Sequence, residues 1–320
     1  GKTVILNRSY SKVWLAIDDE IYRENLIEKM NAREDKYIIS QIVSYHEGPE
    51  RIKAEIAKYD SVIVGDMPAH ERNYIIKYCF GQNIRTYSVP KISDILLRSS
   101  VELNLFDSPL LLSRNNQGLQ IEQEIMKRII DIVGSLIGIV ITIPIFLIVG
   151  ICIKMTDGGP VIYQQTRLTK NGKKFQIYKF RTMVQNAEAD GKARLASEGD
   201  PRILPIGRVL RATRLDELPQ IYNILKGDMS IVGPRPERPE LAAELEKEIP
   251  EFSFRLQVKA GLTGYAQVYG KYNTTPYDKL KLDLTYIRNY SVLEDLKLII
   301  MTPKIMLMKE STEGVKEEQQ

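Results

Sequence analysis

Cysteine and histidine are scarce in this chain of 320 residues, and their scarcity excludes several kinds of site. The two cysteines, Cys79 and Cys152, lie in a predicted helix and in an apolar run. They are therefore poor candidates for a disulfide framework and indicate a reducing compartment. The two histidines, His46 and His70, stand apart and lack the spacing of metal ligands. A fold stapled by disulfides and a site built from Cys and His are both excluded.

Net charge is also small, at +4, but its distribution along the chain is uneven. Residues 1–112 contain 15 Lys and Arg against 16 Asp and Glu, whereas residues 154–214 contain 13 against 5. A basic stretch of this kind attracts the phosphates of nucleotides, nucleic acids or anionic lipids. Because this stretch adjoins an apolar segment and has no recognised nucleic-acid-binding motif, we expect no nucleic-acid partner.

The first 112 residues alternate predicted strands with predicted helices. The expected strands are residues 3–6, 37–45, 61–64 and 84–89, and the expected helices are about 18–31, 49–58 and 70–80. This alternation predicts a Rossmann-like α/β domain with a parallel sheet. The first loop, residues 7–11, lacks the glycines that let a backbone approach a pyrophosphate. We therefore expect a regulatory or packing domain rather than a dinucleotide site.

Charge is absent from residues 132–153, which follow a polar connector at 113–126. As a helix these 22 residues would be about 33 Å long at about 1.5 Å per residue, enough to cross a bilayer. Pro144 lies near the middle, where it removes a backbone hydrogen bond, and it predicts a break or kink. Basic residues flank both ends, so the positive-inside rule sets no orientation.

The flanking regions both have the character of cytoplasmic domains, because the front region has no disulfide framework and the back region is expected to meet a soluble nucleotide. We therefore predict that residues 127–155 form a re-entrant membrane helix, which enters the bilayer and returns to the same side at Pro144.

Two adjacent carboxylates, Asp216 and Glu217, stand just before an apolar run that contains Pro219. Proline is tolerated in the first turn of a helix, so the pattern predicts a helix from about Asp216 to Leu225 that ends at Gly227. Asp216 would then lie at the N-cap, where the helix dipole favours an ionised carboxylate and a neighbouring phosphate.

Arginines near this pair favour a catalytic role over an ordinary helix cap. Arg208, Arg211 and Arg214 recur at a spacing of three, on one face of a helix predicted over residues 203–214. Arg235 follows on a stiff Gly-Pro-Arg-Pro turn, where its planar fork suits phosphate oxygens. Each arginine taken alone could equally be a surface ion pair.

The rest of the back region, residues 156–310, is predicted to be a small, mostly helical α+β domain. A hairpin is expected from residues 161–165 and 175–179 around the turn at 170–173. The helix at 203–214 suits either the surface of a membrane or the ordinary surface of a soluble domain, and a second helix at 292–308, bent at Pro303, suits the surface of a membrane. Residues 311–320 form a polar tail.

A series of short motifs between residues 125 and 305 resembles the bacterial sugar transferases, the monotopic polyprenyl-phosphate phosphoglycosyltransferases. In chain order they are Lys127-Arg128-x-x-Asp131, the apolar helix with its proline, Gln165-x-Arg167, Lys179-Phe180-Arg181-Thr182-Met183, Asp200-Pro201-Arg202-Ile203, Gly207-Arg208-x-x-Arg211, Leu215-Asp216-Glu217-Leu218-Pro219-Gln220, Lys226-Gly227-Asp228-Met229-Ser230, Val232-Gly233-Pro234-Arg235-Pro236, Gly261-Leu262-Thr263-Gly264-x-Ala266-Gln267-Val268, Leu282-Asp283 and Asp295-Leu296-Lys297. Ala260 departs from the family, which often has proline there, and so does Tyr269-Gly270-Lys271.

The resemblance implies a phosphoglycosyltransferase that moves sugar-1-phosphate from a UDP-sugar to undecaprenyl (polyprenyl) phosphate and releases UMP. Asp216 would match the nucleophile that forms an aspartyl-phosphosugar intermediate, and Glu217 its partner, with Mg²⁺ held by Asp216 and Glu217. Phosphate-binding roles would fall to Lys179, Arg181, Arg211 and Arg235. The front domain resembles the CoA-binding-like Rossmann module that precedes the catalytic part in longer members.

The same resemblance implies a place and partners for the protein. It would act on the cytoplasmic face of the bacterial inner membrane, in the first membrane step of exopolysaccharide, capsule, O-antigen or glycoprotein glycan synthesis. Membrane lipid and a second copy in a homodimer are further expected partners, and the sugar stays open. The alternative is a membrane-attached regulatory protein that senses a nucleotide without turnover. UMP release that needs both Mg²⁺ and polyprenyl phosphate would separate the two.

Overall fold

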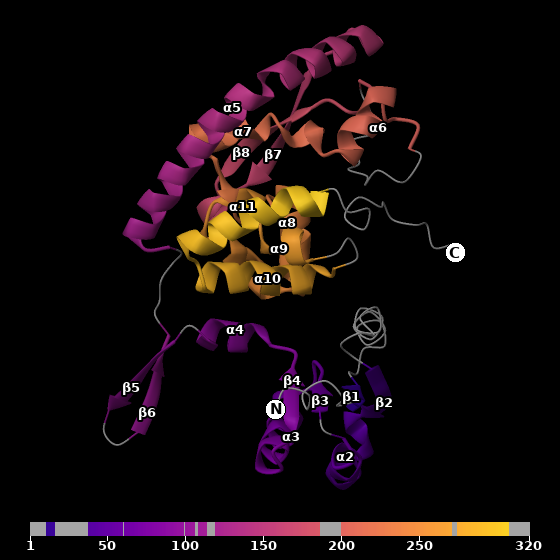
Figure 1. Cartoon of the computed structure of the whole chain (residues 1–320), viewed down its shortest axis with the longest axis vertical. Helices are drawn as coiled ribbons and strands as arrows, with labels where there is room; N and C mark the ends of the chain where they lie inside the picture. The colour runs from indigo at the N-terminus through magenta and orange to yellow at the C-terminus, as the bar shows by residue number, and fades with distance from the viewer. Residues whose placement is uncertain are drawn as a thin grey trace, which may run out of the picture. The chain divides into compact units, whose positions relative to one another are not determined.

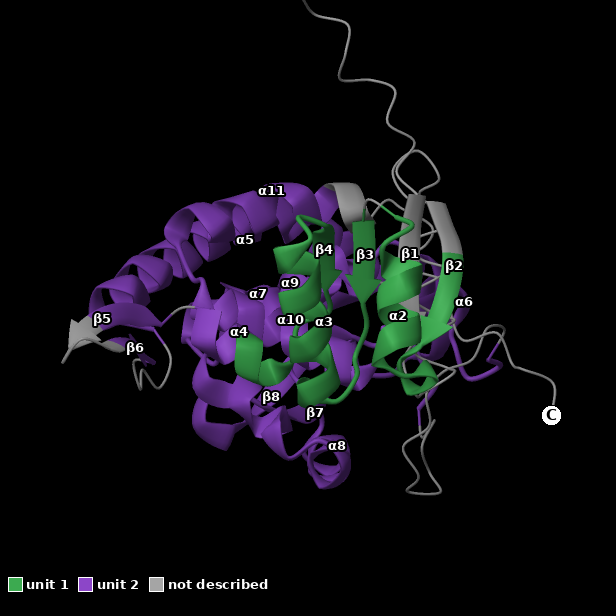
Figure 2. Cartoon of the chain, turned by 90° about the horizontal axis from the view of Figure 1, so that it is seen from below, with its two compact units in different colours: residues 1–94 green, residues 95–320 purple. Residues whose placement is uncertain are grey.

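Two compact units make up the chain, residues 1–94 and residues 95–320 (Figures 1 and 2). The computed structural model describes residues 11–16, 38–59, 61–98, 100–105, 108–113, 119–185, 200–270 and 274–306. Each unit has its own buried apolar clusters, so each is described by itself.

A four-stranded parallel sheet forms the centre of the first unit, with strand order β2-β1-β3-β4. The strands are β1 (Ser11–Ala16), β2 (Ile38–Ser44), β3 (Ser61–Val64) and β4 (Arg85–Ser88). A short 3₁₀ turn η1 (Tyr45–Glu47) follows β2, and the described helices are α2 (Pro49–Ile56) and α3 (Ala69–Gly81), while α4 (Ile92–Arg98) contains the boundary between the two units. All four residues of β3 are buried, as expected for a central parallel strand covered on both faces.

The predicted parallel sheet is therefore confirmed for the described part of this unit, and its closer assignment to the Rossmann class stays a prediction. Ile56, Val62, Val64, Ile75 and Cys79 pack in one buried cluster that joins α2 and α3 to the sheet. Placing Ser11 in a loop was wrong, because it begins β1. The strand expected at residues 3–6 and the helix expected at 18–31 lie outside the described residues.

The described part of the second unit is mostly helical, and the strands in it form three small two-stranded sheets. The antiparallel pairs are β5 (Val101–Leu105) with β6 (Ser108–Leu112) and β7 (Ile162–Leu168) with β8 (Lys174–Phe180), and the parallel pair is β9 (Met229–Val232) with β10 (Ala260–Thr263). The helices are α5 (Ile121–Asp157), α6 (Pro205–Ala212), α7 (Gln220–Lys226), α8 (Pro239–Glu248), α9 (Tyr265–Tyr269), α10 (Pro276–Arg288) and α11 (Val292–Met306), with 3₁₀ turns η2 (Lys170–Gly172), η3 (Leu215–Glu217) and η4 (Pro250–Gln257).

Several local predictions are confirmed in this unit. The β7–β8 hairpin turns through η2, where Asn171 adopts φ 60°, a conformation that asparagine tolerates better than most residues. The helices expected at 203–214 and 292–308 appear as α6 and α11, and Pro303 lies inside α11. The end of the second helix and the polar tail lie outside the described residues.

The prediction that Pro144 breaks the long apolar helix was wrong, because α5 continues through it as one helix of 37 residues. At about 1.5 Å per residue α5 is about 55 Å long. Proline costs the helix one backbone donor, but the turns before and after it remain helical. Thr142 donates its hydroxyl hydrogen to the carbonyl of Gly138, at 2.7 Å, one turn before the proline.

One face of α5 packs against the rest of the second unit along most of the length of the helix (Figure 1). Near the N-terminus Lys127 is buried, in the middle Gly138 faces Ile221, and near the C-terminus Ile153 joins a cluster with Phe180 and Leu210. The other face is exposed and apolar. Its large exposed side chains are Ile125, Met126, Ile129, Val133, Leu136, Ile137, Val140, Ile141, Ile143, Leu147, Ile148, Ile151 and Met155.

An exposed apolar surface of that length marks a contact with lipid or another apolar partner. Only 11% of the most apolar 18-residue window of α5 is buried, and this helix is long and apolar enough to cross a membrane. The core helix of a soluble protein would instead be mostly buried. We conclude that α5 presents its outer face to a membrane.

The first turns of α5 are fastened to the unit by an ion pair in its interior. Lys127 donates to Asp295 of α11 at 2.6 Å and to the hydroxyl of Tyr286 of α10 at 2.9 Å, and all three side chains are buried. The Lys127 ammonium also lies 5.4 Å from the centre of the Tyr290 ring. Since a buried charge is tolerated only when it is paired and hydrogen-bonded, this cluster should hold α5 firmly.

Lys127→Ala should therefore destabilise the protein strongly, by about 3 kcal/mol, because it leaves Asp295 buried without its cation. The measurement is thermal unfolding in detergent, followed by circular dichroism. Lys173→Ala is the matched control, since Lys173 is exposed on the β7–β8 turn. Equal melting temperatures for the two variants would contradict a structural role for the pair.

Candidate active site

The two candidate catalytic carboxylates lie in the 3₁₀ turn η3, between α6 and α7. The prediction that a helix begins at Asp216 was wrong, because α7 begins only at Gln220, after Pro219. Arg214 precedes the turn in the left-handed conformation, with φ 57°, and this redirects the chain after α6. The predicted end of the helix is confirmed, since Gly227 caps α7 with φ 98°.

Glu217 is the buried member of the pair and is held by two cations. Lys179 of β8 donates to its Oε1 at 3.2 Å, and Arg235 reaches the same oxygen at 2.6 Å and Oε2 at 3.4 Å. Burial by itself would raise the pKa of Glu217, but the charges of Arg235 and Lys179 outweigh it and hold that pKa well below its ordinary value. Glu217 is therefore a fixed anion that organises the cations around it.

Asp216 has a different environment from its neighbour. It is half-buried and accepts no hydrogen bond from the part of the chain that the structure describes. Burial raises the pKa of Asp216, and the negative charge of Glu217 adds to the rise. The charges of Lys179, Arg211 and Arg235 oppose it. Asp216 is thus a carboxylate with free oxygens beside three cations, and no helix N-cap stabilises its charge as the sequence suggested.

Three of the four predicted phosphate-binding residues surround this turn. Lys179 and Arg235 contact Glu217, and Arg211 of α6 donates to the hydroxyl of Thr182 at 3.0 Å. Lys179 has a lowered pKa, chiefly because burial disfavours its charge, although Glu217 counteracts this. Arg235 remains partly open to solvent, with 38% of its side chain exposed. A phosphate that approached Asp216 would meet all three cations.

Arg181 is the exception, and the structure gives it a different environment from the predicted phosphate site. It is buried and binds both carboxylate oxygens of Asp157, the last residue of α5. Its Nε donates to the carbonyl of Pro160 at 2.6 Å. These contacts lower the pKa of Asp157 to about 2. With its donors engaged in this way, Arg181 fastens the end of α5 to β8, and these contacts give no support to its predicted role as a phosphate ligand.

The predicted metal site is only half supported by this geometry. Glu217 directs both carboxylate oxygens at cations, so it does not fit as a metal ligand. Among the described residues no three His, Cys, Asp or Glu side chains gather into a metal cage. Mg²⁺ commonly uses only one or two carboxylates together with water and substrate phosphates, and Asp216 alone fits that pattern.

Backbone contacts hold the turn that carries Arg235. Gly233 at the end of β9 donates to the carbonyl of Thr263 at 2.8 Å, and Gly261 donates to the carbonyl of Pro234 at 2.9 Å. Gly233 and Gly261 approach so closely that a Cβ on Gly261 would lie 2.1 Å from the nitrogen of Gly233. Glycine is required at both positions because the two backbones leave no space for a side chain.

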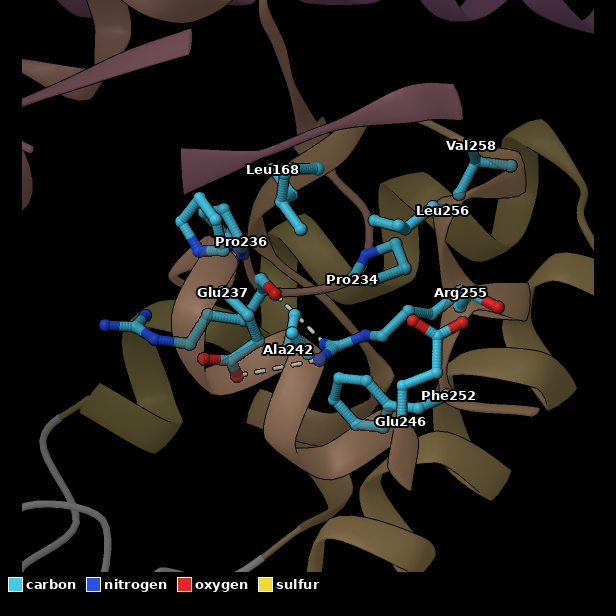
Figure 3. A pocket seen from close by; sticks show the side chains of 15 residues that line it. Leu168, Pro234, Pro236, Glu237, Ala242, Glu246, Phe252, Arg255, Leu256 and Val258 are labelled. Atoms are coloured by element: carbon cyan, nitrogen blue, oxygen red, sulfur yellow. Dashed lines mark hydrogen bonds and ion pairs between the residues drawn. The ribbon is translucent and has the colours of Figure 1, made fainter. Parts of the chain in front are cut away.

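A small cavity of about 120 Å³ lies beside this turn, between α8 and η4 (Figure 3). Arg255 extends across it toward Glu237, and Leu168, Pro236 and Phe252 line its walls. Arg255 donates to the carbonyl of Arg235 at 3.0 Å. Sequence reasoning missed Arg255, because nothing in its local pattern distinguishes it from other charged residues of a helical region.

Comparison with known proteins supports a family assignment for the second unit. Residues 122–309 match the family model for bacterial sugar transferases. The chain belongs to the bacterial sugar transferase family.

Relatives with described activities differ in the sugar that their names give. A UDP-N-acetylgalactosamine-undecaprenyl-phosphate N-acetylgalactosaminephosphotransferase of Aeromonas hydrophila is 35% identical over 259 residues, covering 78% of this chain and 59% of the relative. An undecaprenyl-phosphate galactose phosphotransferase of Salmonella typhimurium is 36% identical over 239 residues, covering 69% and 49%. A UDP-glucose:undecaprenyl-phosphate glucose-1-phosphate transferase of Klebsiella pneumoniae is 33% identical over 258 residues, covering 79% and 53%. The chain thus spans between about half and three-fifths of these relatives' length.

Proposed function

We propose that this sugar transferase moves sugar-1-phosphate from a UDP-sugar to undecaprenyl (polyprenyl) phosphate and releases UMP. The observation that carries the proposal is Asp216, a carboxylate with free oxygens beside the cations Lys179, Arg211 and Arg235. The named activities of the three relatives support the reaction class, and their different sugars leave the sugar of this chain open.

The transfer divides into two displacements at the same phosphorus atom. An oxygen of Asp216 first attacks the β-phosphorus of the UDP-sugar, and the bond to the bridging oxygen breaks, so that UMP leaves with that electron pair. An oxygen of the polyprenyl phosphate then attacks the aspartyl-phosphosugar, and the bond to Asp216 breaks, which restores the carboxylate. Two steps allow a soluble and a lipid substrate to use one site in turn.

The cations make an attack by one anion on another feasible. Lys179 and Arg235 both contact Oε1 of Glu217 and would neutralise the diphosphate where charge develops. Glu217 does not attack, since its oxygens are engaged, but it sets the positions of both cations. Arg211 would add a third contact from α6. Positioning of this kind supplies most of the catalysis in phosphoryl transfer.

Mg²⁺ fits the proposal if Asp216 and the substrate diphosphate hold it together. The free oxygens of Asp216 and the raised pKa of its carboxyl both suit a site that gains a cation with its substrate. When bound, Mg²⁺ would supply charge neutralisation for the diphosphate.

Membrane attachment follows from α5 and sets where the site can meet its lipid substrate. Both ends and the middle of α5 contact the same folded unit. A helix that crossed the bilayer would carry one end of that unit to the opposite side, so the packing favours a helix whose outer face lies in the membrane while both of its ends stay on one side. Such a helix keeps both flanking regions on the same side, as the re-entrant prediction has it, but needs no turn at Pro144. The cytoplasmic face is the side that UDP-sugars would reach.

Asp216→Asn should abolish turnover while the protein folds normally. The amide is a very poor nucleophile, but it has nearly the size of the carboxyl, and Asp216 makes no hydrogen bond with a described residue that the change would break. UMP release from a panel of UDP-sugars, with polyprenyl phosphate and Mg²⁺ present, measures the loss. Glu244→Gln on the exposed surface of α8 is the control. Near-normal UMP release by the purified Asp216 variant would exclude the covalent mechanism.

Turnover should depend on pH through Asp216. Only the ionised carboxylate attacks, and the pKa of Asp216 is raised above 3.8, so kcat/KM should fall with decreasing pH at a midpoint above that value. Lys179→Met removes a charge that lowers this pKa, and the midpoint should therefore move to higher pH. Lys174→Met, at the exposed start of the same strand, should leave it in place. A shift to lower pH, or equal shifts in both variants, would contradict the assignment.

The membrane topology can be tested with single cysteines on either side of the apolar run. We expect Glu122→Cys and Lys173→Cys, made in a background without Cys79 and Cys152, to resist an impermeant thiol reagent added to intact cells. Both positions are exposed, so both should react once the cells are opened. Labelling of one position and not the other in intact cells would show that α5 spans the bilayer.

A further inference from the structure

The main chain that carries Arg235 is bound by side chains that do not contact the catalytic carboxylates. Arg255 of η4 donates to the carbonyl of Arg235 at 3.0 Å, and Arg167 of β7 donates to the carbonyl of Pro236 at 3.2 Å. The next carbonyl, that of Glu237, accepts from the backbone of Leu168 at 3.0 Å. Three consecutive carbonyls are thus fixed from outside the turn, two of them by guanidinium groups.

Acidic partners hold both guanidinium groups in place. The carboxylate of Glu237 lies between them, with one oxygen 4.0 Å from Arg167 and the other 3.5 Å from Arg255. Arg255 also pairs with Asp283 of α10 at 2.8 Å, where the exposed fractions of the two side chains are only 5% and 1%. Two positive and two negative groups therefore balance, with Arg255 and Asp283 buried and Arg167 and Glu237 partly exposed, as a cluster of charges in a largely buried place requires.

We propose that Arg167 and Arg255 are positioning residues that fix the main chain of Arg235 so that its side chain meets Glu217 and the substrate phosphate. The inference rests on the proposed function, because it assigns Arg235 to phosphate binding. Neither positioning arginine forms a hydrogen bond or ion pair with Asp216 or Glu217 in the described part of the chain. Their influence on the reaction therefore passes through the backbone of residues 235–237.

The planar guanidinium group of Arg255 explains why lysine could not replace it. Arg255 uses one planar group to reach a carbonyl on the turn and two carboxylates on different elements. Lysine keeps the charge but is a single point donor on a flexible stem, so it cannot hold the three partners in one plane. An altered carbonyl direction at Arg235 would rotate its side chain away from Glu217, where it now makes a contact of 2.6 Å.

The test is a double-mutant cycle on UMP release with Arg255→Lys and Arg235→Lys. We expect each single variant to lose at least about tenfold in kcat/KM, and the double variant to fall no more than about twofold below Arg235→Lys alone. If Arg255 acts only through Arg235, replacing Arg255 should have little further effect once the guanidinium group of Arg235 has been replaced. Arg72→Lys is the matched control, because Arg72 is a buried arginine paired with Asp94 in the first unit, and it should leave kcat/KM unchanged.

Losses that multiply in the double variant would overturn the proposal, since they would show that Arg255 acts independently of Arg235. A single Arg255→Lys variant with parental kcat/KM would also overturn it. Thermal unfolding of each variant separates a positioning effect from partial unfolding. If Arg255 had a merely structural role, Arg255→Lys would lower the stability of the protein, and this loss would add to that of Arg235→Lys in the double variant. If the parent itself releases no UMP from any UDP-sugar, the proposed function fails first. Binding of UDP, measured by calorimetry on the same four proteins, then still reports whether the two changes are coupled.

Discussion

A buried carboxylate that must be neutralised is the constraint on which the catalytic unit depends. Glu217 has almost no access to water, and it is kept ionised by Lys179 and Arg235. Those cations come from the hairpin strand β8 and from the turn after β9, so the ion pairs join three segments that are distant in sequence. Removing either cation would leave charge buried without a partner, which costs far more than a surface ion pair. The site is therefore organised before any substrate arrives.

Side chains of α5 also hold α7 and β9, which adjoin the segments of the site. Arg128 of α5 donates to the carbonyls of Ile224 and Leu225, both at 2.7 Å, and these are among the last carbonyls of α7. A cation at the C-terminus of a helix satisfies carbonyls that have no partner within the helix and also opposes its dipole. Asp131 accepts from the backbone of Ile231 in β9 at 2.8 Å. Arg128 and Asp131, near the start of α5, thus connect the apolar helix to the core of the second unit.

Sequence reasoning succeeded where local pattern decides the structure and failed where distant partners do. The β7–β8 hairpin, α6 and α11 follow from turn chemistry and periodicity within each segment. The contact of Arg181 with Asp157, the last residue of α5, could not be foreseen because the two residues are 24 positions apart, and the role of Arg181 as a phosphate ligand stays a prediction. The start of α7 was misplaced because Arg214 adopts a left-handed conformation that no neighbouring residue signals. Asp216 and Glu217 were found together, but only the fold shows that Glu217 is bound by two cations while Asp216 accepts no hydrogen bond from any described residue.

The first turns of α5 join the catalytic segments to the apolar outer face of the helix. Arg128 holds the end of α7, a short helix that begins three residues after Glu217, while Asp131 holds the strand that leads to Arg235. The apolar outer face of α5 passes through the same turns, with Ile129 and Val133 exposed there. One helix end therefore carries both the contacts to the catalytic segments and the apolar outer face. Under the proposed function, this arrangement would let a lipid phosphate reach Asp216 while its polyprenyl chain stays in the bilayer.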